Sequence, residues 1–212
     1  MNRYVGEDQV WPVGYDGRMT ASADLPWPES WERRSSANSL RKIPAIEEYL
    51  DPTDGESLIY TYGAAHGRYL RTSVEAHRRG RPSGHSSLPR ISQGHLVWKL
   101  NATWPHLYSN ILDYYLEPYI PYYEVKRAYE PILLSFDIGD HIWLWMVNDT
   151  AAPISGSYRA VLFSMRSNEM INELVGPAAI QAGESGELTD LDGFGQFDEE
   201  CILYAELLDQ DG

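Results

Sequence analysis

The chain has 212 residues, 43% of them hydrophobic and 12% aromatic, and it carries a formal net charge of −14. Such a chain can bury a sizeable core, which excludes a disordered protein and predicts one large or two small domains. The negative charge argues against nucleic acid as a partner, because phosphate groups attract Lys and Arg rather than carboxylates. The single cysteine, Cys201, excludes an internal disulfide framework.

The N-terminal region, residues 1–35, is rich in Pro, Gly and Trp and has no sustained periodicity. We expect a long ordered loop with short helical turns there. The first residues, MNRYVGEDQV, lack the basic start and the apolar run of a signal peptide, and no run reaches the roughly 18 apolar residues of a membrane span. A soluble, cytoplasmic protein with no membrane partner is therefore expected.

The next segment, residues 54–79, has the periodicity of a helix. Apolar or aromatic residues recur close to the spacing of one helix face, at Leu58, Tyr62, Ala65, Tyr69 and Val74. Gly80 and Pro82 then stop the pattern, as these residue types do at helix ends. The sequence predicts a helix over these residues, followed by a loop at 81–93.

Residues 95–101, HLVWKLN, predict a short buried strand, and the turn NATWPHL comes after it. A second helix is expected from Pro121, because proline suits the first turn of a helix and Tyr122, Val125 and Tyr129 recur three and four residues apart. Pro131 ends this helix.

Beyond Pro131 the period changes to that of strands. ILLSFDI and HIWLWMVND flank the hairpin dipeptide Gly139-Asp140, and both are rich in β-branched and aromatic residues. Two further strands are predicted, SGSYRAVLFSMR and ECILYAELL, with a Gly- and acid-rich connection at about 176–198 between them. The pattern is typical of part of an antiparallel β-sandwich.

The distribution of charge places a domain boundary at the same point. Residues 1–130 carry 15 basic and 16 acidic residues, whereas residues 131–212 carry 2 and 15, a net charge of −13. The acidic part is expected to present a solvated surface. The chain is therefore divided into an α/β part, residues 1–130, and an all-β part, residues 131–212.

Several motifs in the middle of the chain occur in the order and spacing of a known family. WKLNATWP, from Trp98 to Pro105, is followed by NILDYY at 110–115 and by PYYEVKRAYEP at 121–131. They resemble the end of the catalytic barrel of glycoside hydrolase family 2, especially its β-mannosidase-like members. The resemblance covers residues 58–150 and implies the last one or two β/α units of a (β/α)8 barrel, followed by an incomplete Ig-like β-sandwich.

The same resemblance implies a sugar site. In a (β/α)8 barrel the substrate lies at the C-terminal ends of the strands, so the segment from Trp98 to Trp104 would lie at the active face. An indole offers an apolar wall and an N–H group to a pyranose, and the Asn101 amide both donates and accepts. Trp98, Asn101 and Trp104 are therefore candidate substrate-binding residues. The alternative for the two indoles is a structural role as a plug beneath the barrel.

The family hydrolyses β-glycosides with retention, by means of a nucleophilic glutamate and an acid/base glutamate. Glu7, which precedes the Trp11-Pro12 loop at a suitable distance, is the candidate nucleophile, and an ordinary surface carboxylate is the alternative. The acid/base would lie upstream of the chain. Asn168-Glu169 and Asn172-Glu173 imitate its Asn-Glu dipeptide, but they lie in the sandwich part.

The expected function is thus a fragment of a retaining exo-β-glycosidase, β-mannosidase-like and inactive alone. Its expected partners are a β-mannoside or related β-glycoside and either the missing N-terminal part of the enzyme or a second copy. Neither a metal nor a cofactor is expected, since the six histidines show no helical metal spacing and no phosphate-cradling loop is present. The alternatives are a non-catalytic carbohydrate-binding or assembly subunit, and a piece with no binding role.

Overall fold

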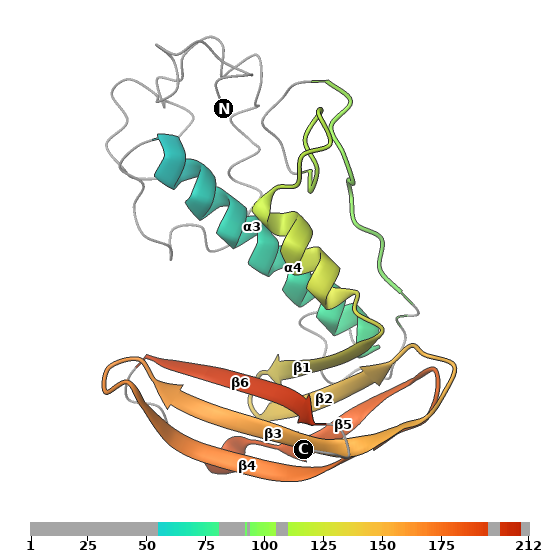
Figure 1. Cartoon of the computed structure of the whole chain (residues 1–212), viewed down its shortest axis with the longest axis vertical. Coiled ribbons are helices and arrows are strands. Elements are labelled where there is room, and N and C mark those ends of the chain that lie inside the picture. The colour runs from blue at the N-terminus through green and yellow to red at the C-terminus, as the bar shows by residue number, and fades with distance from the viewer. Residues whose placement is uncertain (1–54, 81–91, 93, 105–109, 195–199, 209–212) are drawn as a thin grey trace. The chain divides into compact units, whose positions relative to one another are not determined.

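A computed structural model of the chain describes residues 55–80, 92, 94–104, 110–194 and 200–208 (Figure 1). Its helices and strands, in chain order, are α3 (Gly55–Arg78), α4 (Ile120–Ala128), β1 (Ile132–Ile138), β2 (Ile142–Asn148), β3 (Ile154–Ser164), β4 (Glu169–Ile180), β5 (Glu184–Asp190), the short 3-10 helix η3 (Asp192–Phe194) and β6 (Cys201–Leu208). Both predicted helices are confirmed. In the part of the chain that is described, no helix combines the length and the apolar character needed to cross a membrane.

The chain divides into two compact units, and the division falls within α3. The first unit holds the chain up to Val74 together with Leu96–Ala128, and the second holds Glu75–His95 together with Tyr129–Gly212. The second unit therefore takes the last turn of α3 and the segment after it, in addition to all the strands.

In the first unit α3 and α4 lie side by side and run in the same direction (Figure 1). Two glycines of α3 allow the close approach: a Cβ atom added to Gly63 would lie 3.0 Å from the side chain of Ile120, and one added to Gly67 would lie 3.3 Å from the backbone of Pro121. One turn further along, Arg71 donates to Glu124 at 3.2 Å. The contacts advance along both helices together, so the helices are parallel.

A small apolar core joins α4 and α3 to the residues between them. Leu70, Ile111 and Val125 are buried in it, and Val97 and Tyr122 pack against it. Because parallel neighbouring helices need a connection that returns along their length, the chain between α3 and α4 must run back in the opposite direction. The extended segment 96–102 makes this return.

The C-terminal end of α3 belongs to the second unit. Gly80 adopts a left-handed conformation, with φ of 79°, and its N–H donates to the carbonyl of His77 at 2.9 Å. This is the usual way in which a glycine ends a helix. The buried Arg79 side chain donates to the Ser135 hydroxyl at 3.0 Å, and Arg78 donates to the Asp149 carboxylate at 2.8 Å, so the helix end is attached to β1 and to the residue after β2.

The second unit is otherwise a β-sandwich. One sheet has the order β1-β2-β5 and the other the order β4-β3-β6, and all described pairings are antiparallel. The predicted hairpin is confirmed, with Ile132 opposite Asn148 and Ile138 opposite Ile142. The core lies between the two sheets, where alternate residues of the strands meet two residues that follow β5, Leu191 and Phe194. Its buried strand residues are Leu144, Met146, Tyr158, Ala160, Leu162, Ala178 and Ile180.

Two strands lie where the sequence predicted a connection. β4 continues to Ile180, and β5 occupies Glu184–Asp190 within the predicted connection at 176–198. Their residue types are not typical of strands, because β4 contains Gly176 and Pro177 and β5 has the polar sequence ESGELTD. Both lie at sheet edges among the described strands, where one side is unpaired and strong β-formers are not required. The prediction of a connection over about 176–198 was wrong for the end of β4 and for β5, for this reason.

Candidate functional site

The segment from Leu96 to Trp104 carries the candidate substrate-binding residues and forms no regular strand, with bends at Trp98 and Leu100 and an isolated bridge at Asn101. Its side chains alternate in exposure, with Val97 and Lys99 half-buried between the exposed Leu96, Trp98 and Leu100. The Trp98–Lys99 peptide bond is cis.

This segment is the main departure from the predicted buried strand. Leu96 is 94% exposed, Trp98 80% and Leu100 57%. In the described part of the chain, its ladder is limited to one bridge, between Asn101 and Leu112, with Leu112 N–H donating to the Leu100 carbonyl at 2.8 Å. The prediction of burial was wrong for this segment, because a strand is buried on both faces only where other elements pack against each face, and no described element covers Leu96, Trp98 and Leu100.

The candidate residues themselves are at the surface. Trp104 is 48% exposed, and the Asn101 amide nitrogen donates to the neighbouring Ala102 carbonyl at 3.3 Å, which leaves the Asn101 side chain close to its own backbone. Glu7, the candidate nucleophile, lies outside the described residues. The assignment of Trp98, Asn101 and Trp104 to a sugar site stays a prediction.

The loop that follows contains two buried polar residues that the sequence analysis did not single out as site residues. Asp113 is buried and its carboxylate accepts the Glu117 N–H at 2.8 Å, which closes the turn in which Leu116 has a φ of 65°. Asn110 is 1% exposed, and neither polar atom of its amide has a hydrogen-bond partner among the described residues. A buried amide without partners costs about 1–3 kcal/mol. Both residues lie in the NILDYY motif at 110–115 that the sequence analysis used for the family resemblance.

One histidine of the first unit is strongly perturbed. His66 lies on α3, 4% exposed, with the Tyr62 ring 6.1 Å away. Burial lowers its pKa from 6.5 to about 4, because the charged imidazolium is poorly solvated there. The side chain is therefore neutral at pH 7, and it forms part of the packing of the helix.

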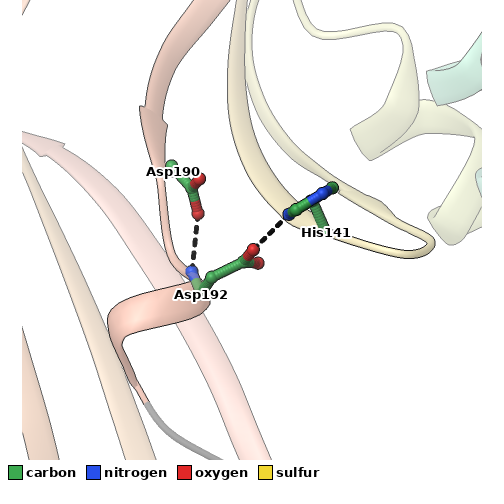
Figure 2. A group of neighbouring side chains, drawn as sticks. All are labelled: His141, Asp190 and Asp192. Atoms are coloured by element: carbon green, nitrogen blue, oxygen red, sulfur yellow. Dashed lines mark hydrogen bonds and ion pairs between the residues drawn. The ribbon is translucent and has the colours of Figure 1, made fainter.

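In the second unit, His141, Asp190 and Asp192 form a cluster at the surface (Figure 2). The Asp192 carboxylate accepts hydrogen bonds from the His141 imidazole and, at 2.8 Å, from the Ile142 N–H, while its own N–H donates to Asp190 at 2.7 Å. These bonds attach the β1–β2 hairpin to the end of β5. Hydrogen bonding to Asp192 raises the pKa of His141, and the bonds from Ile142 and His141 lower the pKa of Asp192.

The cluster has the residue types of a metal site, since its ligand atoms lie within 4.8 Å of one another. However, both oxygens of Asp192 already accept hydrogen bonds and all three residues are exposed. A cation would have to displace those bonds. The cluster is explained by its structural role at the hairpin.

Comparison with known proteins identifies relatives that match about two thirds of the chain. No family model matches it. It is 29% identical over 144 residues to β-mannosidase B of Aspergillus niger, and 23% identical over 167 residues to exo-β-D-glucosaminidase of Amycolatopsis orientalis. These matches cover 61% and 67% of the chain but only 16% of each relative.

The fold is also shared with solved structures. The β-D-mannosidase of Dictyoglomus thermophilum matches 98% of the chain with a TM-score of 0.75 at 21% identity, and the match covers 23% of that enzyme. The exo-chitosanase CsxA of Amycolatopsis orientalis matches 83% of the chain with a TM-score of 0.67 at 18% identity. The resemblance drawn from the sequence motifs is thus confirmed: the chain is similar to a part, under a quarter, of a β-mannosidase-like glycoside hydrolase of family 2.

Proposed function

We propose that the chain is the C-terminal end of the barrel and the following sandwich of a retaining exo-β-glycosidase, and that it is inactive by itself. The substrate class is a β-mannoside or a β-D-glucosaminide, because the relatives are named for these sugars. The chain supplies the sugar-binding wall from Trp98, Asn101 and Trp104.

The exposed row of Leu96, Trp98 and Leu100 is the observation that carries this proposal. Three large apolar side chains exposed within five residues are costly in water, at about 25 cal/mol per Å2 of apolar surface. In a closed barrel each strand has a neighbour on both sides, and its inward side chains are covered. The exposed row therefore supports the proposal that this segment pairs with barrel strands that lie outside the chain.

Two further features support a barrel origin. The parallel α3 and α4, joined by the extended return segment, have the arrangement of successive helices around a β/α barrel. The Asn110 amide, which has no hydrogen-bond partner in the described part of the chain, would gain partners from added strands.

The proposed inactivity of the chain follows from the catalytic groups that retaining hydrolysis requires. Retaining hydrolysis requires a proton donor for the leaving group and a carboxylate nucleophile about 5 Å from it. In the proposal Glu7 is the nucleophile, and the acid/base lies on the missing strands. Without general acid catalysis the rate falls by about 10²–10⁴, and loss of the strands that orient the sugar lowers it further.

The test is release of p-nitrophenol from aryl β-mannosides and β-D-glucosaminides. The full chain alone should release none. Adding the Aspergillus niger β-mannosidase B truncated before its matching segment should restore activity, and Glu7→Gln should abolish it and Trp98→Ala reduce it. Ile138→Ala, at an exposed strand end, is the matched control that should leave it unchanged. Turnover by the chain alone that disappears in Glu7→Gln would contradict the proposal.

A carbohydrate-binding role without catalysis is the second candidate, and the exposure of Trp98 and Trp104 favours it. The same proteins distinguish the two. Binding of manno- or chito-oligosaccharides by calorimetry, lost in Trp98→Ala, together with no activity under any complementation, would support binding alone.

A further inference from the structure

Two histidines of the second unit lie side by side, apart from the candidate residues discussed so far. His77 belongs to the last turn of α3, and His95 comes directly before the segment that begins at Leu96. Their ring centres are 5.0 Å apart and their ring planes are inclined by 49°. The fold thus brings together two imidazoles from different segments, which helical spacing in the sequence could not predict.

The hydrogen bonds around His77 determine which of its ring nitrogens carries the proton. Its Nδ1 lies 2.8 Å from the Ser92 hydroxyl oxygen. That hydroxyl has one proton, and it donates this proton to the Gly94 carbonyl at 3.2 Å. In this arrangement the Ser92 oxygen accepts from His77, so Nδ1 carries the hydrogen and Nε2 carries the lone pair of the neutral ring.

Tyr129, the residue after α4, makes the matching arrangement at His95. Its hydroxyl donates to the His95 carbonyl at 2.7 Å, and its oxygen lies 3.3 Å from Nδ1 of the same residue. The oxygen therefore accepts from Nδ1, which again places the hydrogen on Nδ1 and the lone pair on Nε2. Burial and, to a smaller extent, the neighbouring His77 lower the pKa of His95, so this ring is neutral at pH 7.

Neutral imidazoles held in this way have the properties of metal ligands. A metal-bound histidine uses one ring nitrogen for the cation and commonly donates the other N–H to an oxygen, which fixes the orientation of the ring. Zn–N bonds are about 2.0–2.1 Å long, so two imidazoles bound through Nε2 to one tetrahedral zinc ion have ring centres about 5 Å apart. The separation of His77 and His95 agrees with this value.

The charges around the pair are compatible with a bound cation. Arg78, the residue after His77, donates to the Asp149 carboxylate and to the Glu130 carbonyl, both at 2.8 Å, so its positive charge is compensated. Residues 131–212, which belong to the same unit, carry a net charge of −13, and a negative field attracts cations.

We propose that His77 and His95 together bind one divalent transition-metal ion through their Nε2 atoms. Imidazole nitrogen suits zinc, copper and nickel, and zinc is the probe for the test below. The two histidines supply two of the four positions of a tetrahedral ion, and water completes the coordination. Structural zinc sites use four protein ligands, so we expect this half-exposed site to bind zinc reversibly. The proposal is independent of the glycosidase activity proposed above.

Calorimetric titration of the full chain with zinc, without a polyhistidine tag, tests the proposal. His77→Ala and His95→Ala should each remove a site for one zinc ion that the native chain has. Tyr129→Phe keeps both imidazoles but removes the oxygen that holds His95, so it should weaken binding by about 10–100-fold. His141→Ala is the matched control, because it removes an exposed histidine from elsewhere in the same unit and should leave binding unchanged.

Two-bond ¹H–¹⁵N NMR spectra of the histidine rings identify the atoms involved. In the metal-free chain at neutral pH, both His77 and His95 should carry the hydrogen on Nδ1. Zinc should then shift the Nε2 resonances of both rings together. Circular dichroism checks that the variants fold, and if one does not, the NMR spectra of the native chain decide alone.

Three results would overturn the proposal. The first is a hydrogen on Nε2 of either ring in the metal-free chain, or no shift of these rings with excess zinc. The second is zinc binding by His77→Ala and His95→Ala that equals binding by the native chain. The third is loss of binding in His141→Ala, since this would make the cluster with Asp190 and Asp192 the zinc site.

Discussion

Acid should destabilise the first unit through His66, and replacing this residue should remove the effect. In the folded protein its pKa is about 4, whereas the unfolded chain has the ordinary value of 6.5. Between these values the unfolded chain takes up a proton that the native protein does not. The stability that depends on neutral His66 is therefore complete above pH 6.5 and is lost as the pH falls toward 4.

The size of the effect follows from the two pKa values. The difference between 6.5 and about 4 is about 2.5 units, at about 1.4 kcal/mol per unit. Linkage then gives a loss of about 2 kcal/mol in the free energy of unfolding between pH 7.5 and 5, and about 3 kcal/mol by pH 4. His66→Phe keeps a ring in the buried position and cannot take up a proton, so this part of the pH dependence should vanish.

The assay is urea unfolding followed by circular dichroism at 222 nm, where helices dominate the signal, at several pH values between 7.5 and 5. At each pH, the free energy of unfolding of the native chain minus that of His66→Phe gives the contribution of His66. The carboxylates contribute equally to both proteins and cancel. An NMR titration should show the His66 imidazole neutral down to pH 5. A measured pKa near 6.5, or identical pH dependence of the two proteins, would refute the reasoning.

Three further outcomes are expected in the sandwich. Leu144→Ala removes a fully buried side chain from between the sheets and should cost about 3 kcal/mol of unfolding free energy in urea titrations, whereas Ile138→Ala, 69% exposed, should cost little. Gly176→Ala should lower the stability by about 1–3 kcal/mol, because its Cβ would lie 2.5 Å from the hydroxyl of buried Tyr158; Gly186→Ala meets open space, and an equal loss there would contradict the steric explanation. His141→Asn should lower the urea midpoint most between the lowered pKa of Asp192 and pH 6.5, since the ion pair is charged on both sides there. The difference from the native chain should shrink as the pH rises through the raised pKa of His141, and a difference that grows above pH 8 would show that charge is not the cause.

Local sequence was enough to predict a helix or strand wherever the spacing of apolar residues agreed with the positions of Gly and Pro. The spacing from Tyr62 to Val74, ended by Gly80, predicted α3, and Pro121 and Pro131 bracketed α4. Runs of β-branched and aromatic residues on either side of Gly139 and Asp140 predicted the β1–β2 hairpin, but not its register. The motifs from Trp98 to Pro131 were specific enough to predict the family resemblance that the comparisons confirm.

Strand pairing decided the features that the sequence did not predict. A strand is stabilised by neighbouring strands, and its own sequence does not show which segments these are. β5, with the polar sequence ESGELTD, is a strand because β2 supplies its hydrogen-bond partners, while the apolar segment Leu96–Leu100 lies exposed because no described strand covers it. The burial of His66, which sets its pKa, and the burial of Asn110, whose amide has no partner among the described residues, likewise depend on residues distant in the chain. Composition and spacing determined which segments could form elements; only the tertiary structure decided which of their faces are covered, since burial belongs to pairs of segments and not to either one alone.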